Sequence, residues 1–271
     1  MLQRLLLLIG VVLFSFTDQS FAQELPGNEN YSYAVLARLS DNAEIIASAK
    51  VNRAIILPAE RAPNVAPGKV RIYVEADILG LIRGRGGLPE SIRYLVDMPL
   101  TERGKAPKIK RETFLLFARR GGSANELQLI GPDAQMPWTQ TLNDRVRAIT
   151  QQLLAADAPP PITGVKEIFH VPGNLQGEGE TQIFLNTPNG DPVSISILRR
   201  PRQTPVWAVS LSEIVDAAAT RPRRDTPLWY RLACGLPREV PDDVLFSANR
   251  RSNMIAREDY SLVLRDLGPC E

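Results

Sequence analysis

The sequence predicts an α+β fold: an N-terminal antiparallel β-barrel or sandwich, followed by a smaller α+β domain with a hairpin and two to three helices. Residues 31–131 form one strand-like segment after another, with little helical periodicity. The rest of the chain mixes a hairpin pattern with apolar residues at helical spacing. A proline-rich run at residues 158–162 separates these regions and is typical of a linker. We therefore expect a β-rich domain with a closing helix at residues 31–157 and an α+β domain at residues 163–271.

Alternating apolar and polar side chains predict the strands of the first domain. The clearest strand is residues 69–79, in which valine and isoleucine alternate with charged and aromatic residues. The other strands are predicted at residues 44–57, 92–96, 113–118 and 127–130. The order of a long bent strand, a second long strand, a short strand and a hairpin resembles an OB-type barrel. Bends at Gly80 and Gly84 would supply the curvature that such a barrel needs.

Helical spacing and turn residues predict the remaining elements. Leu142, Val146, Ile149 and Leu153 fall on one face of a helix at residues 141–155. In the second domain, an Asn-Gly turn between two alternating segments predicts a hairpin. The strands are predicted at residues 181–186, 192–198, 205–210 and 260–264, and the helices at residues 212–219 and 225–235.

The first 22 residues have the pattern of a secretory signal peptide. Arg4 gives a positive start, residues 5–16 are almost wholly apolar, and small residues precede a cleavage site after Ala22. As a helix, the apolar run would be about 18 Å long, which is too short for a hydrocarbon core of roughly 30 Å. An uncleaved membrane anchor is the alternative interpretation. We expect a periplasmic or secreted protein with a flexible lead-in at residues 23–30 and no transmembrane span in the mature chain.

Cys234 and Cys270 predict a disulfide, because exported compartments are oxidising. The alternative is a nucleophilic Cys234 that uses His170 as its base. With one histidine and two cysteines, the chain lacks the ligands for a His-rich or four-cysteine zinc site. Nucleotide-binding loops and metalloprotease motifs are also missing from the sequence. We therefore predict no metal site and no cofactor.

The best local candidate for a catalytic site surrounds His170. Glu178 and Glu180 follow it in a glycine-rich stretch, and a histidine near carboxylates can act as a general acid or base. This hypothesis describes an exported hydrolase. The alternative interpretation is a structural loop whose histidine makes one hydrogen bond.

Arginine far outnumbers lysine, which indicates either an anion-binding surface or the codon bias of a GC-rich genome. The net charge of +2 and the sparse aromatic residues argue against nucleic-acid binding. If two arginine clusters met in space, they would bind lipid headgroups or another anionic ligand. The candidate binding residues are Arg199, Arg200, Arg202, Arg221, Arg223 and Arg224.

The leading interpretation is a soluble exported binding or envelope-assembly protein without catalytic activity, because export, strands and missing catalytic motifs coincide. Its partner would be an envelope protein or an anionic ligand. The hydrolase at His170 and the arginine-rich anion-binding surface remain the alternatives.

Overall fold

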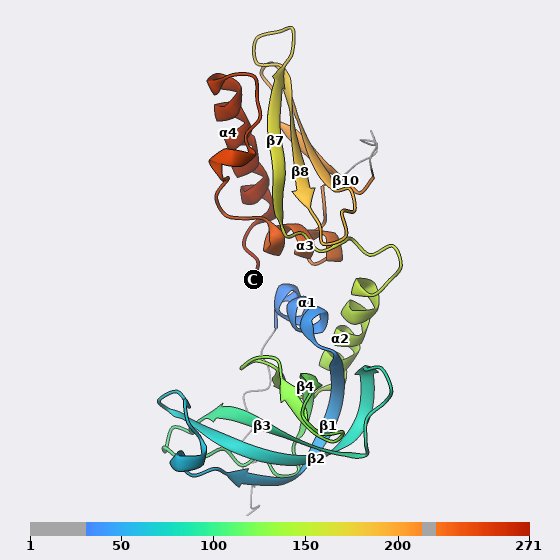
Figure 1. The fold of residues 1–271 in the computed structure, drawn as a ribbon, viewed down its shortest axis with the longest axis vertical. Coiled ribbons are helices and arrows are strands. Elements are labelled where there is room, and N and C mark those ends of the chain that lie inside the picture. The colour runs from blue at the N-terminus through green and yellow to red at the C-terminus, as the bar shows by residue number, and fades with distance from the viewer. Residues whose placement is uncertain (1–30, 213–220) are drawn as a thin grey trace, which may run out of the picture.

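The computed structural model describes residues 31–212 and 221–271, which form two antiparallel sheets and four α-helices (Figure 1). The predicted α+β class is therefore confirmed. The signal peptide at residues 1–22, the lead-in at residues 23–30 and nearly all of the helix predicted at residues 212–219 lie outside the described residues. Among the described helices, none is both long and apolar enough to cross a bilayer.

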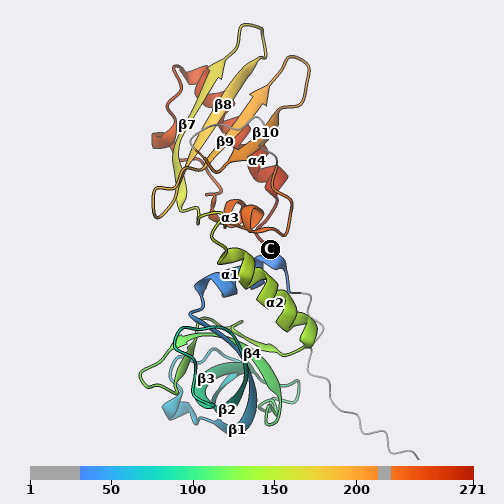
Figure 2. The ribbon, with the colours of Figure 1, turned by 90° about the vertical axis from the view of Figure 1, so that its right-hand side faces the viewer.

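The first sheet contains the five strands predicted from the sequence, in the order β3-β2-β1-β4-β5, and a short sixth strand, β6, which was not predicted and pairs with β4. Its strands are β1 (Ile45–Ile56), β2 (Lys69–Arg83), β3 (Ser91–Pro99), β4 (Thr113–Arg120), β5 (Leu127–Leu129) and β6 (Gln135–Pro137). A single 3-10 turn, η1 (Ala59–Arg61), lies between β1 and β2. The sheet curls around its own apolar core, which contains Ile72, Val74, Phe114 and Leu116 (Figure 2).

The predicted barrel is not closed. β3 and β5 lie side by side, but the pairing along them is limited to one parallel bridge between Arg93 and Glu126, the residue before β5, where Arg93 N donates to Asn125 O at 2.8 Å. β5 ends at Leu129, and the chain then turns at Gly131 towards β6. The three residues of β5 are too few to follow the nine residues of β3, so no continuous ladder closes the sheet at this seam.

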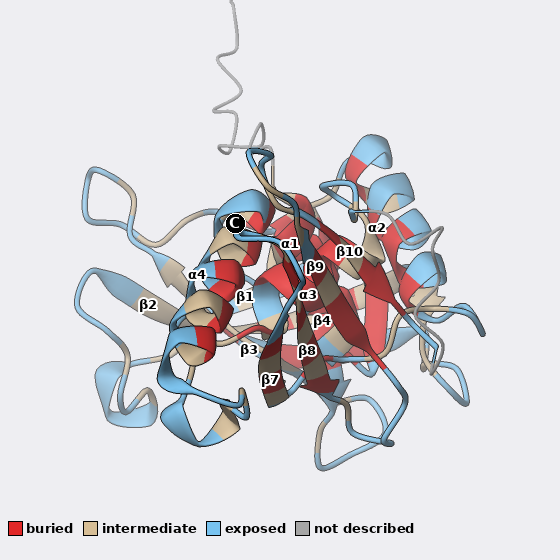
Figure 3. Cartoon of the chain, turned by 90° about the horizontal axis from the view of Figure 1, so that it is seen from above, coloured by how far each residue is buried: buried red, intermediate tan, exposed pale blue. Residues whose placement is uncertain are grey.

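The second sheet has the order β10-β9-β8-β7, and all of its pairs are antiparallel. Its strands are β7 (Gly164–Pro172), β8 (Gly179–Asn186), β9 (Ser194–Arg199) and β10 (Val206–Ser210). β8 and β9 form the predicted hairpin, and β10 is the predicted third strand. Helix α4 (Arg250–Leu267) lies against the sheet with its buried stripe facing β7 and β8 (Figure 3).

The strand predicted at residues 260–264 is wrong, because these residues belong to α4. The apolar run alone is compatible with either a strand or a helix. Helical spacing decides: Ala256, Tyr260, Val263 and Leu267 fall on one buried face. The Asn249 side chain also caps the helix by accepting a hydrogen bond from Ser252 N at 2.9 Å.

Three further helices lie between the two sheets: α1 (Tyr33–Asn42), α2 (Gln140–Leu153) and α3 (Pro227–Gly235) (Figures 1 and 2). α2 and α3 match the helices predicted at residues 141–155 and 225–235. α1 was missed, because the segment from residue 31 was interpreted as the start of the strands. Ser32 caps α1 by accepting from Val35 N at 3.3 Å.

One apolar core continues from the helices into the second sheet, and it includes Leu36 of α1, Trp229 of α3 and Ile183 of β8. Tyr33 and Trp229 meet edge to face, with ring centroids 6.4 Å apart. The boundaries predicted at residues 158–162 stay a prediction. A short 3-10 turn, η2 (Asp242–Val244), leads the chain from α3 towards α4.

Candidate functional site

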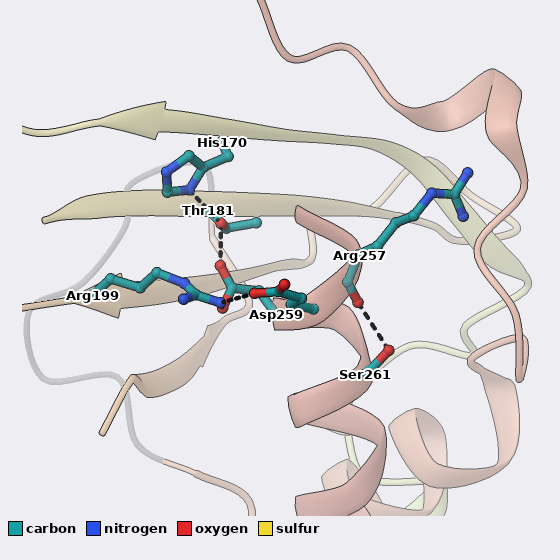
Figure 4. Close-up of polar contacts among 7 residues, drawn as sticks. His170, Thr181, Arg199, Arg257, Asp259 and Ser261 are labelled. Atoms are coloured by element: carbon teal, nitrogen blue, oxygen red, sulfur yellow. Dashed lines mark hydrogen bonds and ion pairs between the residues drawn. The ribbon is translucent and has the colours of Figure 1, made fainter. Parts of the chain in front are cut away.

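His170 lies in β7 on the face of the second sheet that α4 covers, and only 3% of its surface is exposed. Its Nδ1 is 2.9 Å from Thr181 Oγ1 on the neighbouring strand β8. Thr181 Oγ1 donates to Asp259 Oδ2 of α4 at 2.5 Å. Arg199 Nε donates to the other Asp259 oxygen at 2.8 Å (Figure 4). A chain of polar contacts therefore joins three strands, β7, β8 and β9, and the helix α4.

The direction of these hydrogen bonds defines the proton on His170. The Asp259 carboxylate can only accept, so the hydroxyl proton of Thr181 is used in that contact. Thr181 Oγ1 is then the acceptor for His170, which must carry its proton on Nδ1. The neutral ring consequently presents an unprotonated Nε2.

Burial lowers the pKa of His170 below its ordinary value of 6.5, and the nearby Arg199 cation lowers it further. Asp259 acts in the opposite direction and raises the pKa, but burial is the larger cause. Gly179 makes room for the ring, because a Cβ at this position would lie 2.5 Å from His170 Cε1. His170 is thus held neutral and closely packed at neutral pH.

The structure does not bring Glu178 or Glu180 to the His170 ring. Glu178 Oε2 instead accepts from Asn174 N and Leu175 N, both at 3.1 Å, and so stabilises the β7–β8 turn. Glu180 accepts a hydrogen bond from Gln182, on the opposite face of β8 from Thr181. Within the described residues, no hydrogen bond or ion pair joins His170 to either glutamate. The acid–base partners that the hydrolase hypothesis names are therefore not assembled.

Three of the six candidate arginines stabilise the second sheet and its helices. Arg199 pairs with Asp259, and its Nη2 lies 3.3 Å from Glu258. Arg221 pairs with Asp266 at 2.8 Å and stacks over Trp207. Arg224 stacks over the Trp229 ring, with 5.0 Å from its guanidinium carbon to the ring centroid. The other three arginines are exposed: Arg200, Arg202 and Arg223.

The predicted disulfide between Cys234 and Cys270 is present, and it ties the end of α3 to the segment after α4. Cys234 is therefore not available as a free nucleophile. Within residues 31–212 and 221–271, no group of three or more His, Cys, Asp or Glu side chains is arranged to hold a metal ion.

A cleft of about 1010 Å³ opens in the first sheet at the seam between β3 and β5. Its size is at the upper end of the usual range for ligand-binding pockets. We call it the seam cleft. The residues that matter for its chemistry are Lys69, Arg71, Arg93, Leu95, Arg120 and Leu129.

The pairing of β3 with β2 determines which main-chain groups face the seam cleft. Ile78 N donates to Glu90 O, and Leu100 N donates to Gly68 O, both at 2.8 Å. Because hydrogen-bonded and non-hydrogen-bonded pairs alternate in an antiparallel ladder, the even-numbered residues of β3 bond to β2. The odd-numbered residues of β3 direct their N–H and C=O groups away from β2, towards the seam cleft.

Arg93 follows this rule, since its N–H reaches Asn125 across the seam. The main-chain groups of Leu95 and Asp97 point in the same direction. Beyond the Arg93 bridge, no strand of the described chain pairs with this edge of β3. Leu129 lies on the facing edge of β5, which is likewise unpaired on that side. The seam cleft therefore lies over two neighbouring strands that pair only at the Arg93 bridge.

Both acidic side chains that line the seam cleft form ion pairs with arginines of the same cleft. Arg71 Nε lies 2.7 Å from Asp97 Oδ1, and Arg93 lies 3.6 Å from Glu126. The hydrogen bond from Arg71 holds the pKa of Asp97 below its ordinary range. This carboxylate is ionised at neutral pH and is matched by its arginine.

Two further cations of the cleft make no ion pair among the described residues. Lys69 is one, and its side chain lies at the start of β2. Arg120 is the other, and its Nη2 donates to the carbonyl oxygens of Arg85 and Gly87 at 2.6 and 2.8 Å. The seam cleft thus has an excess of positive charge.

Sequence reasoning missed the seam cleft, because no motif marks it. It arises where two strands more than 30 residues apart come together without pairing fully. The one available signal was the shortness of the β5 segment beside the long β3 segment.

Comparison with known proteins does not add to this geometry. No family model matches the chain, and no curated protein matches its sequence. The chemistry of the site must therefore be argued from its own residues.

Proposed function

We propose that this protein is an exported, non-catalytic binding or envelope-assembly protein that holds its partner in the seam cleft. The observation that carries the proposal is the cleft itself, which combines a ligand-sized volume with two cations, Lys69 and Arg120, that make no ion pair among the described residues.

Export is part of the same proposal. It is supported by the leader pattern at residues 1–22 and by the Cys234–Cys270 disulfide, a bond that persists in oxidising compartments. We include an OB-type relationship for the first sheet. The sheet order and the parallel contact of β3 with β5 support it.

The polar network around His170 favours a structural role over the hydrolase alternative. Its members are hydrogen-bonded to one another, and His170, Thr181 and Asp259 are buried between sheet and helix. The two glutamates make their hydrogen bonds with other residues. The alternative of an arginine-rich anion-binding surface is less well supported, because half of its residues are engaged in ion pairs or ring contacts.

Capture from an envelope extract with matched variants tests this proposal. Gly122 lines the seam cleft, and a Cβ at this residue would have open space around it, so Gly122→Trp should fill the cleft without a clash. Val171, which is 56% exposed on the second sheet, supplies the matched control Val171→Trp. The wild type and Val171→Trp should recover the same specific partner, and Gly122→Trp should lose it.

Two results would overturn the proposal. One is recovery of the same partner by Gly122→Trp. The other is a hydrolytic activity that disappears in His170→Gln, because it would make the His170 region the functional site instead.

A further inference from the structure

We infer that the loop between β3 and β4, residues 100–112, is a docking surface for an anionic phospholipid bilayer. We call this segment the basic loop. The inference goes beyond the proposed function, because it concerns a surface outside the seam cleft and a different kind of partner. It follows from three properties of the basic loop: its charge, its fixed position and the exposed apolar residues beside it.

The basic loop concentrates positive charge. Five of its residues are cationic and two are acidic, which leaves a net charge of +3, whereas the whole chain has +2. The cations are Arg103, Lys105, Lys108, Lys110 and Arg111, and the acids are Glu102 and Glu112. All seven side chains are exposed, and within the described residues none of them forms an ion pair. Lys69 at the start of β2 does not add to this excess, because it lies beside the Asp97 carboxylate.

The lysines of the chain are unevenly distributed. Three of its six lysines lie within residues 105–110, although arginine outnumbers lysine in the chain as a whole. A codon bias towards arginine does not explain this cluster. Lysine presents a compact charge on a flexible stem, whereas arginine offers a rigid fork for bidentate recognition. Flexible cations suit a surface of mobile headgroups better than a partner of fixed geometry.

Core packing and main-chain hydrogen bonds hold the basic loop in place. Ile109 is 1% exposed and belongs to the core of the first sheet, although the lysines on either side of it are exposed. Arg111 N donates to Val51 O at 2.8 Å, and Val51 N donates to Glu112 O at 2.9 Å. These contacts attach the end of the loop to β1. A fixed segment therefore presents the cations to solvent.

Exposed apolar residues lie next to the basic loop. Leu100, its first residue, is 37% exposed, and Leu100 N donates to Gly68 O at 2.8 Å. Met98 precedes Leu100 by two residues and pairs with Val70, and both are only partly buried. Ile56, the last residue of β1, is 55% exposed. We call Ile56, Val70, Met98 and Leu100 the apolar rim.

The basic loop and the apolar rim lie away from the helices of the molecule. The hydrogen bond from Leu100 to Gly68 joins the basic loop to the β1–β2 loop, which contains η1. Both views of the fold place η1 at the end of the first sheet opposite α1 (Figures 1 and 2). A bilayer can approach this end without meeting the second sheet.

Charge and apolar exposure together match a bilayer surface. Anionic headgroups attract basic segments, and each Lys or Arg near the surface raises the affinity by about fivefold. Apolar side chains beside these cations insert at the boundary between headgroups and acyl chains. A soluble polyanion would match the basic loop but would make no use of the apolar rim.

Flotation of the processed chain with lipid vesicles tests the inference. Residues 1–22 are removed, because their apolar run would itself bind lipid, and this leaves every described residue in place. The vesicles are phosphatidylcholine with about 30% phosphatidylglycerol, and pure phosphatidylcholine vesicles are the comparison. We expect binding to the anionic vesicles that falls steeply between about 0.05 and 0.5 M salt, and little binding to the neutral ones.

A lysine variant locates the surface. Lys105→Gln/Lys108→Gln/Lys110→Gln should weaken binding to the anionic vesicles by roughly a hundredfold, because three factors of about five combine. These side chains are exposed and unpaired, so the variant should fold, which circular dichroism checks.

The matched control is Arg200→Gln/Arg202→Gln/Arg223→Gln. It removes the same charge from exposed arginines outside the first sheet, so it should weaken vesicle binding far less. A loss in this control that equals the loss in the lysine variant would overturn the inference, since net charge and not the basic loop would then decide binding.

The apolar rim separates a bilayer from a soluble polyanion. Roughly half of the Ile56 side chain remains to be buried, so Ile56→Ser should weaken vesicle binding by about fivefold and leave binding to soluble heparin unchanged. Val171→Ser, at a residue that is 56% exposed on the second sheet, is the matched control and should change neither. If Ile56→Ser binds vesicles as the wild type does, the surface recognises polyanions in general and the inference fails.

The results also separate this inference from the proposed function. Gly122→Trp should keep vesicle binding, because Gly122 lines the seam cleft and not the basic loop. A wild type that does not bind anionic vesicles overturns the inference and leaves partner capture by the seam cleft standing. If Gly122→Trp keeps the envelope partner while the vesicles bind as expected, the proposed partner site fails and the inference stands.

Discussion

At the scale of single residues, His170 makes the stability of the protein depend on pH. It is the one histidine of the chain, so a change in stability between about pH 5.5 and 7.5 can be assigned to it by substitution. Its surroundings are the Thr181 hydroxyl, the Asp259 carboxylate and the Arg199 guanidinium. In this setting the cost of burying the charged ring exceeds the help that Asp259 gives.

Because the pKa of His170 is lower in the folded chain than its ordinary value of 6.5, the unfolded chain takes up the proton first. Proton binding therefore favours unfolding. We expect the free energy of unfolding to be level above pH 7.5 and to fall as the pH drops below about 6.5. Urea unfolding at successive pH values measures this. His170→Gln should lose that part of the slope, and an unchanged slope in His170→Gln would contradict the assignment.

At the scale of elements, the disulfide joins two helices that otherwise meet through few contacts. Cys234 lies within α3, and Cys270 follows α4, which covers the second sheet. Trp229 Nε1 also donates to Leu267 O at 2.8 Å, so the same two helices share a buried hydrogen bond. The disulfide closes a loop of 36 residues between the two cysteines.

Removing this disulfide should destabilise the protein, because the unfolded chain regains the freedom that the closed loop restricts. The double variant Cys234→Ala/Cys270→Ala is expected to lose about 2–4 kcal/mol in the free energy of unfolding, measured by urea titration. Dithiothreitol should produce a similar loss in the wild type and none in the double variant. A wild type that is insensitive to complete reduction would contradict this account.

The elements also show what could be predicted from the sequence. Strands with clear alternation, such as β2, and helices with a long apolar stripe, such as α2, were predicted because their signals are local. The end of α4 was mistaken for a strand, since a five-residue apolar run has no distinctive period. Contacts between residues far apart in the sequence could not be predicted from local patterns. His170 and Asp259 are joined only by the pairing of β7 with β8 and the position of α4.

At the scale of the whole molecule, an ion pair connects the helices that lie between the two sheets. Arg231 of α3 is 7% exposed, and it holds Asp41 of α1 in a two-pronged contact in which Nη2 lies 3.1 Å from Oδ1. Arg231 Nε also donates to Pro159 O at 3.1 Å. The guanidinium therefore contacts α1, which precedes the first sheet, and the segment between α2 and the second sheet.

A double-mutant cycle measures how strongly this pair couples the two halves. Arg231→Met should destabilise the protein by about 1–3 kcal/mol, because it leaves the partly buried Asp41 without its partner. Adding Asp41→Leu removes the orphaned charge and should recover part of the loss, which corresponds to a coupling energy of about 0.5–3 kcal/mol. Arg257→Met is the control: its partner Asp242 is 96% exposed, so the change should stay within about 1 kcal/mol. A coupling energy near zero would mean that apolar packing around Trp229 alone holds the two sheets together.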